Sequence, residues 1–330
     1  MTMEKNKVKI IAETFRTSLG FPQVLSKSGS ELLFESDAFT GLFRERFGIS
    51  AENQETFNYA FQAVTEGEGN EITKINSVSS SALLPLLVFY KLYHPREGQH
   101  IRITLEGRTI EFSKAYFEVK NNVIGRPSSV DVALISKDED TILFLESKLA
   151  EMFESSTPEK EYGKSYKPLY SGTAIEEALN MGGIEVDTDA TNLILRSEKE
   201  THYIEGIKQT ISHLIGLVRG PQATDDQKDY IEAYERAKRL IYSPILFDTS
   251  SIINEATDES SKFASLYSKV IGSNRDSILE TIKKWDKNLG HKRESNNKKI
   301  DICPSVLTYQ NIMNDNPSWL DERVKTFYGL

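Results

Sequence analysis

Three charged residues near the middle of the chain have the types and spacing of a metal-dependent hydrolytic site. They are Asp131, Glu146 and Lys148, and they lie where two β-rich runs flank the polar turn Lys137–Asp140. A turn centred there places Asp131 opposite Glu146. Opposed residues of an antiparallel pair have Cβ atoms about 4.5–5.5 Å apart, so two carboxylates there repel each other unless a cation lies between them. The hairpin therefore predicts a cation site.

The same strand predicts what the third residue does. Residues i and i+2 share a face of a strand, so Lys148 lies beside Glu146 while Ser147 points to the other side. A hard cation such as Mg²⁺ suits such an oxygen-rich site, because it binds one or two carboxylates and keeps water and a substrate phosphate oxygen. Lys148 would then orient or deprotonate a water and counter phosphate charge. A structural ion pair is the alternative explanation.

Composition excludes several other classes of protein. The 330 residues, 38% of them hydrophobic and 27% charged, are ordinary for a soluble globular protein, and the net charge of −9 argues against a protein that coats nucleic acid by bulk charge. The single cysteine, Cys303, excludes an intramolecular disulfide and favours the reducing cytoplasm. The first twenty residues lack the apolar stretch of a signal peptide. The longest apolar run, 82–90, is far shorter than the roughly 20 residues that span a bilayer, so we expect no membrane contact.

Hydrophobic periodicity predicts the elements around the hairpin. We expect a mainly helical region over 1–65 and a core helix over 71–93. A long polar stretch at 151–190 is interpreted as an insertion, and the region from 251 onward as helical. The predicted strands lie at 101–119, with a turn at Glu106–Gly107, at 130–135, at 141–148 and at 238–247, where Pro244 indicates an edge or a bulge, and an amphipathic helix at 203–218 ends at Gly220.

Asp131, followed after a hairpin by Glu146-Ser147-Lys148, resembles the PD-(D/E)XK nuclease superfamily, although Pro127 does not adjoin the aspartate. The resemblance implies an α/β fold with a restriction-endonuclease-like core, in which helices flank a central mixed β-sheet. The core would span 66–250, including the insertion at 151–190. Helical elaborations would precede it at 1–65 and follow it at 251–330. The implied activity is Mg²⁺- or Mn²⁺-dependent hydrolysis of DNA, in a restriction, defence or repair setting, by a possible homodimer.

The resemblance also suggests residues that assist the site. Many members supply another carboxylate from the first helix, and Glu71 is the best candidate, with Glu66 and Glu68 as alternatives. Some members carry Gln and, four residues later, Tyr on the helix that follows the Glu-x-Lys strand. Gln209 and His213 match that spacing, with His in place of Tyr, and lie on one helical face. The pair could orient a metal-bound water or touch a phosphate.

Further residues are candidates for contact with DNA. Arg126 precedes the site in sequence, and Lys164, Tyr166 and Lys167 interleave cations with an aromatic ring, which suits phosphate contact and base stacking. A solvated loop explains the last three equally well. The main rival function is a catalytically inactive module of the same fold that binds nucleic acid or a protein partner.

Overall fold

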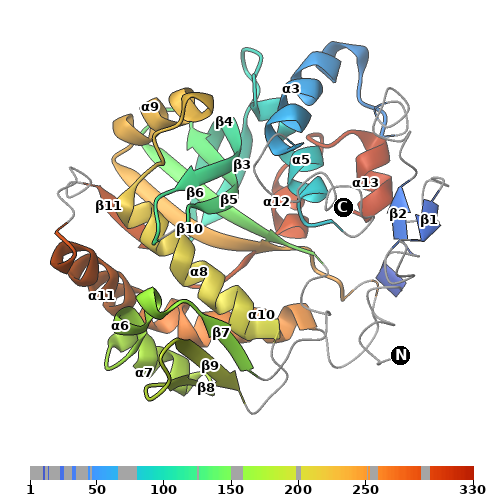
Figure 1. Cartoon of the computed structure of the whole chain (residues 1–330). Helices are drawn as coiled ribbons and strands as arrows, with labels where there is room; N and C mark the ends of the chain where they lie inside the picture. The colour runs from blue at the N-terminus through green and yellow to red at the C-terminus, as the bar shows by residue number, and fades with distance from the viewer. Residues whose placement is uncertain are drawn as a thin grey trace.

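A mixed, curled β-sheet lies between two groups of helices (Figure 1). This confirms the α/β class and the flanked mixed sheet expected from the sequence. The computed structural model describes residues 10–11, 14, 23–25, 32–34, 44, 47–65, 80–124, 126–149, 159–197, 202–250, 252, 259–290 and 298–330. The predicted helix start at Glu71, with Glu66 and Glu68, lies outside the described residues.

The central sheet has seven strands in the order β11-β10-β6-β5-β4-β3, with β12 also beside β10. Neighbouring strands from β3 to β6 are antiparallel, and β10 runs parallel to β6, β11 and β12. The strands are β3 (Ile101–Leu105), β4 (Arg108–Asn121), β5 (Ser128–Ser136), β6 (Thr141–Lys148), β10 (Arg239–Leu246), β11 (Lys299–Ile302) and β12 (Leu307–Thr308).

Both faces of the sheet are buried, because side chains of β5 alternate between two hydrophobic cores. Val132 and Leu134 pack into one core, and Ala133 and Ile135 into the other. Helices of the first face are α3 (Gln54–Thr65), α5 (Leu83–Phe89), α12 (Tyr309–Asp315) and α13 (Glu322–Tyr328). Those of the second are α6 (Lys167–Tyr170), α7 (Ala174–Met181), α8 (His202–Arg219), α9 (Lys228–Arg236), α10 (Glu259–Val270) and α11 (Arg275–Asn288).

The long helix α8 follows its predicted range closely and lies directly against the sheet. A Cβ atom at Gly216 would lie only 2.8 Å from the Cβ of Asn121 on β4, so glycine permits this close approach. The predicted turn at Glu106–Gly107 is also confirmed, with φ of 47° and 77°, as a two-residue hairpin with positive φ at both positions requires. These two features fix α8 and the β3–β4 hairpin on the sheet.

The sheet differs from the expectations in two respects. The region after residue 251 is not entirely helical, because β11 and β12 extend the central sheet beyond β10. The strand that contains Pro244 is therefore internal, not an edge. Pro244 lies between the residues that pair with β11 and those that pair with β12. A proline, which has no N–H to donate, is tolerated at such a break in the pairing.

The polar stretch 151–190 is more structured than its composition suggested. Its described part forms β7 (Glu159–Tyr162), β8 (Ile184–Asp187), α6 and α7, and β7 and β8 pair with β9 (Leu193–Ser197) in a separate three-stranded sheet. Buried Leu169, Tyr170 and Ile175 join this part to the core beneath α8 and α10. The N-terminal region, expected to be helical, likewise contains a short antiparallel pair, β1 (Gln23–Leu25) and β2 (Leu32–Phe34).

Short 3₁₀ helices complete the described chain at Ala51–Asn53, Tyr90–Leu92, Lys164–Tyr166, Asp225–Gln227 and Gly272–Asn274. No helix in the described ranges is both long and apolar enough to cross a membrane.

Candidate active site

The predicted hairpin register is confirmed where β5 and β6 pair. Val132 pairs with Leu145, and the pairs continue to Ile135 with Ile142. Asp131 precedes the first of these pairs, and its carboxylate continues the connection between the strands, since Oδ2 accepts a hydrogen bond of 2.6 Å from the Ser147 backbone N–H. The hairpin thus brings Asp131 next to the Glu146-Ser147-Lys148 segment.

Glu146 lies at the centre of the site and is only 4% exposed. Its Oε1 accepts hydrogen bonds from Lys148 Nζ, at 2.8 Å, and from the side-chain amide of Gln209. Its Oε2 lies 3.1 Å from Nε2 of His213. The two contacts from α8 come from residues four apart, which share one helical face. The structure therefore brings together Asp131, Glu146, Lys148, Gln209 and His213.

Ser147 confirms the predicted alternation along β6. Its hydroxyl accepts a hydrogen bond of 2.9 Å from Tyr309 on α12, a helix of the first face, while α8 contacts Glu146 on the second. Glu146 and Ser147 thus lie on opposite faces of the sheet.

The surroundings shift the pKa values of Glu146 and Asp131 in opposite directions. Burial by itself would raise the pKa of Glu146, but Lys148 and His213 outweigh it and hold that pKa at about 2. Burial raises the pKa of Asp131 well above its ordinary value, and the nearby charges of Glu146 and Glu118 raise it further. The protein surroundings by themselves therefore disfavour the charged form of Asp131. A bound cation would stabilise that form.

Glu118 belongs to this cluster and was missed in the sequence. The β4–β5 pairs Phe117–Val132 and Val119–Val130 place it across from Asp131. Its φ of 49° is positive, and its Oε2 accepts a hydrogen bond of 2.7 Å from the Ser129 hydroxyl. Phe117 and Val119 lie in opposite cores, whereas alternate residues of a regular strand share one face. Only the pairing of β4 with β5 reveals this residue as a neighbour of Asp131.

Ser128 was missed as well. It begins β5, and its Oγ lies 2.6 Å from Nδ1 of His213, the ring nitrogen that does not face Glu146. The contact joins residues 85 positions apart in the chain. A serine after Arg126-Pro127 carries no local signal of such a partner.

The predicted DNA-contacting residues lie in different surroundings. Arg126 and Lys164 are exposed. The Tyr166 ring contacts a lysine of α8, and Lys167 donates to the Ala190 carbonyl. His213, also proposed to contact substrate, is only 2% exposed, so its position suits support of Glu146 better than contact with a phosphate.

That lysine of α8, Lys208, forms a second buried charged site. Its Nζ lies 4.0 Å from the centre of the Tyr166 ring and 4.9 Å from that of Tyr162, and it donates a hydrogen bond of 2.6 Å to Ser212. Burial lowers the pKa of Lys208 to about 8, against an opposing effect of Glu205. We call these four side chains the lysine–tyrosine cluster: Lys208, Tyr162, Tyr166 and Ser212.

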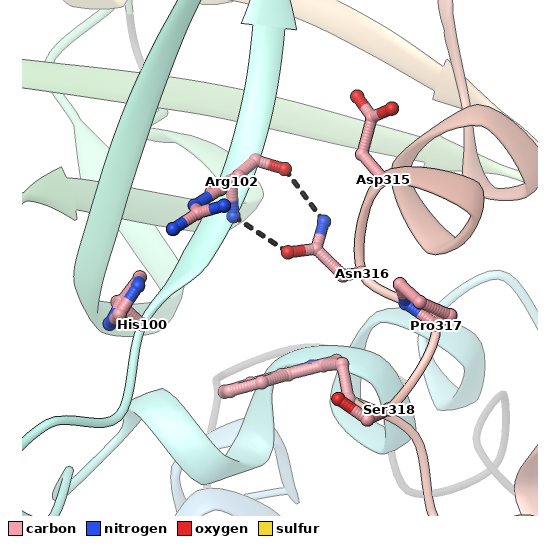
Figure 2. A pocket seen from close by; sticks show the side chains of 7 residues that line it. His100, Arg102, Asp315, Asn316, Pro317 and Ser318 are labelled. Atoms are coloured by element: carbon pink, nitrogen blue, oxygen red, sulfur yellow. Dashed lines mark hydrogen bonds between the residues drawn. The ribbon is translucent and has the colours of Figure 1, made fainter.

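A hollow elsewhere on the molecule lies between β3 and the segment after α12 (Figure 2). Asn316 there bonds the main chain of Arg102 on both sides, accepting from its N–H at 2.9 Å and donating to its carbonyl at 2.7 Å. The amide thus takes the place of a neighbouring strand at the sheet edge. Asn316 thus satisfies main-chain groups of the edge strand β3 beside the hollow. The hollow is lined by His100, Arg102, Asp315, Asn316, Pro317, Ser318 and Trp319.

The site at β5 and β6 suits a hard cation only in part. Within the described ranges, no three His, Cys, Asp or Glu side chains are grouped as metal ligands. Magnesium, however, commonly takes one or two carboxylates and completes its shell with water and substrate oxygens. Asp131 is partly exposed, and Oε2 of Glu146 has no hydrogen-bond partner besides the nearby Nε2 of His213. These two carboxylates fit such an ion.

Comparison of the chain with protein-family models, with curated proteins and with solved structures finds no match.

Proposed function

We propose that the chain is a metal-dependent nuclease that hydrolyses phosphodiester bonds of DNA with Mg²⁺ or Mn²⁺. The observation that carries this proposal is the meeting of Asp131, Glu146 and Lys148 at the end of the β5–β6 hairpin. Lys148 Nζ bonds Glu146 Oε1, and Asp131 bonds the residue between them. Two carboxylates and a lysine are the groups that this chemistry needs.

The arrangement of elements supports a restriction-endonuclease-like core. The strands β4, β5 and β6 form an antiparallel meander, α8 crosses the face that carries Glu146, and β10 returns parallel to β6. This is the strand–helix–strand order of the PD-(D/E)XK superfamily that the Asp131 and Glu146-Ser147-Lys148 pattern resembles. A restriction, defence or repair role in the cytoplasm, and action as a homodimer, belong to the same proposal.

Each residue of the cluster has a defined task in this mechanism. Asp131 and Glu146 would hold the metal ion, which when bound polarises the phosphate and lowers the pKa of a water. Lys148 orients the attacking water, and its positive charge offsets negative charge on the phosphate. The water oxygen forms a bond to phosphorus and gives up a proton to solvent, while the bond from phosphorus to one sugar oxygen breaks and that oxygen takes a proton from solvent. Gln209 keeps Glu146 in place from α8.

A cleavage panel tests the proposal. Circular and linear DNA, single- and double-stranded, and a matched RNA would be incubated with Mn²⁺, Mg²⁺ or EDTA and the wild type, Glu146→Gln or Lys148→Met. We expect metal-dependent cutting of DNA that both substitutions reduce at least about 100-fold. Lys238→Met is a matched control, because its ion pair with Asp140 is largely exposed. Cutting that persists in Glu146→Gln, or in EDTA, would contradict the proposal.

One observation favours a second candidate, a catalytically inactive module of the same fold that binds nucleic acid or a protein partner. Both oxygens of Glu146 already face internal donors, Lys148 and Gln209 on one side and His213 on the other. In this case DNA would bind without being cut, and Mn²⁺ would not raise the melting temperature. The same panel, read by gel shift, separates the two functions.

A further inference from the structure

We propose that Ser128 and His213 are positioning residues for Glu146, and that Ser128 sets which nitrogen of the imidazole carries the proton. The proposal rests on the nuclease function, since it assigns the pair the task of presenting Glu146 to the metal ion. Neither residue would touch substrate.

The three side chains form a continuous buried line. Ser128 Oγ lies 2.6 Å from His213 Nδ1, and His213 Nε2 lies 3.1 Å from Glu146 Oε2. Their exposed fractions are 9%, 2% and 4% in that order. Water therefore has little access to replace a lost partner, and an unpaired polar group in such surroundings is costly. Each contact must be made by the protein itself.

The chemistry of a neutral imidazole gives this line a direction. One ring nitrogen is a donor and the other an acceptor, and the partner of one fixes the other. Ser128 can donate its hydroxyl proton to Nδ1, which leaves the ring proton on Nε2. That nitrogen faces a carboxylate, which can only accept. The opposite tautomer would place two acceptors, Nε2 and Oε2, against each other.

Among the described residues, no other group competes for Nε2 of His213 or for Oε2 of Glu146. Both atoms are buried, and neither has another hydrogen-bond partner. The Tyr242 ring, 5.7 Å from the His213 ring between centres, packs against the imidazole. Oε1 of Glu146 is already held by Lys148 and Gln209. The Nε2 proton therefore completes the orientation of the carboxylate, and groups that orient ligands in this way typically change metal affinity about 10–100-fold when removed.

The test reads the tautomer directly, without metal or DNA. The chain has five histidines, so ¹⁵N-labelled histidine gives few resonances, and His213→Gln identifies those of His213. At alkaline pH we expect the wild type to carry the proton on Nε2, and Ser128→Ala to weaken that preference, because only the Glu146 carboxylate then favours it. Ser136→Ala is a matched control, because Ser136 is a buried serine at the other end of β5.

The second reading is the Mn²⁺ concentration that gives half of the full rise in melting temperature. Ser128→Ala should raise this midpoint about 10-fold, and Ser136→Ala should leave it unchanged. In a His213→Gln background the glutamine amide can donate to Glu146 without help from Ser128. There, Ser128→Ala should add no further loss.

Three results would overturn the proposal. They are an unchanged tautomer in Ser128→Ala, an unchanged Mn²⁺ midpoint in that variant, and covalent labelling of Ser128 by a fluorophosphonate, which would make Ser128 a nucleophile. If the wild type shows no response to Mn²⁺ and cuts no DNA, the nuclease function fails, and with it the metal role of the pair. A tautomer change in Ser128→Ala would still support the orientation of His213 by Ser128.

Discussion

Helix α8 contacts buried charged groups on two of its faces, and the surroundings of these groups differ. Toward the sheet, Gln209 and His213 contact a carboxylate that Lys148 also neutralises. Toward the insertion, Lys208 lies on the rings of Tyr162 and Tyr166, and the nearby carboxylate of Glu205 only partly offsets the effect of its burial. The contacts on the sheet side stabilise the charged form of Glu146. The surroundings on the insertion side disfavour the charged form of Lys208.

The pKa values express this difference. The pKa of Glu146 is held at about 2, because Lys148 and His213 outweigh burial. Burial dominates at Lys208 and lowers its pKa to about 8. Folding thus favours the charged form of Glu146 and disfavours the charged form of Lys208. The sheet-facing side therefore holds Glu146 in its charged form, which suits the proposed metal-dependent site.

The largest expected effect comes from breaking the charge pair on the sheet side. Lys148→Met leaves Glu146 buried without its main counter-charge and should lower the free energy of unfolding by about 3 kcal/mol. Urea denaturation measures the loss. Lys238→Met, which removes a largely exposed partner of Asp140, should change the stability by less than about 1 kcal/mol. Equal losses in the two variants would show that the buried Glu146–Lys148 pair contributes no more to stability than an exposed ion pair.

A second prediction concerns the lysine–tyrosine cluster. Because the folded pKa of Lys208 lies below its ordinary value, the unfolded chain binds more protons above pH 8, and stability rises with pH there. Between pH 7 and 10 the wild type should gain up to about 2 kcal/mol relative to Lys208→Met, since one pKa unit corresponds to about 1.4 kcal/mol. Denaturation of both proteins across this range measures the gain. A constant difference would mean that Lys208 is solvated like a surface lysine.

The smallest effect is expected outside both faces of α8, at Arg126. This exposed residue precedes β5, and its guanidinium is proposed to contact a phosphate near the site. Arg126→Ala should weaken DNA binding a few-fold and reduce its dependence on salt, with no change in melting temperature. Binding measured at several salt concentrations tests this prediction. An unchanged salt slope would remove Arg126 from the DNA interface.

The sequence predicted much of the sheet-facing side because its signals are local. The β5–β6 register follows from a short polar turn between apolar strands, and the pairing of Gln209 with His213 follows from helical spacing. Ser128 and Glu118 could not be found in this way, since their neighbours come from strand pairing and from a helix far along the chain.

The errors have a similar origin. The strands β11 and β12 are stabilised by pairing with β10, and with four and two residues they are too short for an alternating pattern to identify them from the sequence. Pro244 was interpreted as a sign of an edge or a bulge because the break between β11 and β12 cannot be read from the local sequence. The insertion was judged by its polar residues, although a few buried apolar side chains are enough to pack it beneath α8.

The central claim, that Asp131 serves metal-dependent cleavage, is tested most directly by Asp131→Asn. The amide oxygen can still accept from the Ser147 N–H, while removal of the charge relieves repulsion from Glu146 and Glu118. Cleavage of circular DNA with Mn²⁺ and the melting temperature would be measured on the same preparation. We predict a protein at least as stable as the wild type, no longer stabilised by Mn²⁺, and at least about 100-fold slower in cleavage. Undiminished cutting by Asp131→Asn would contradict the account.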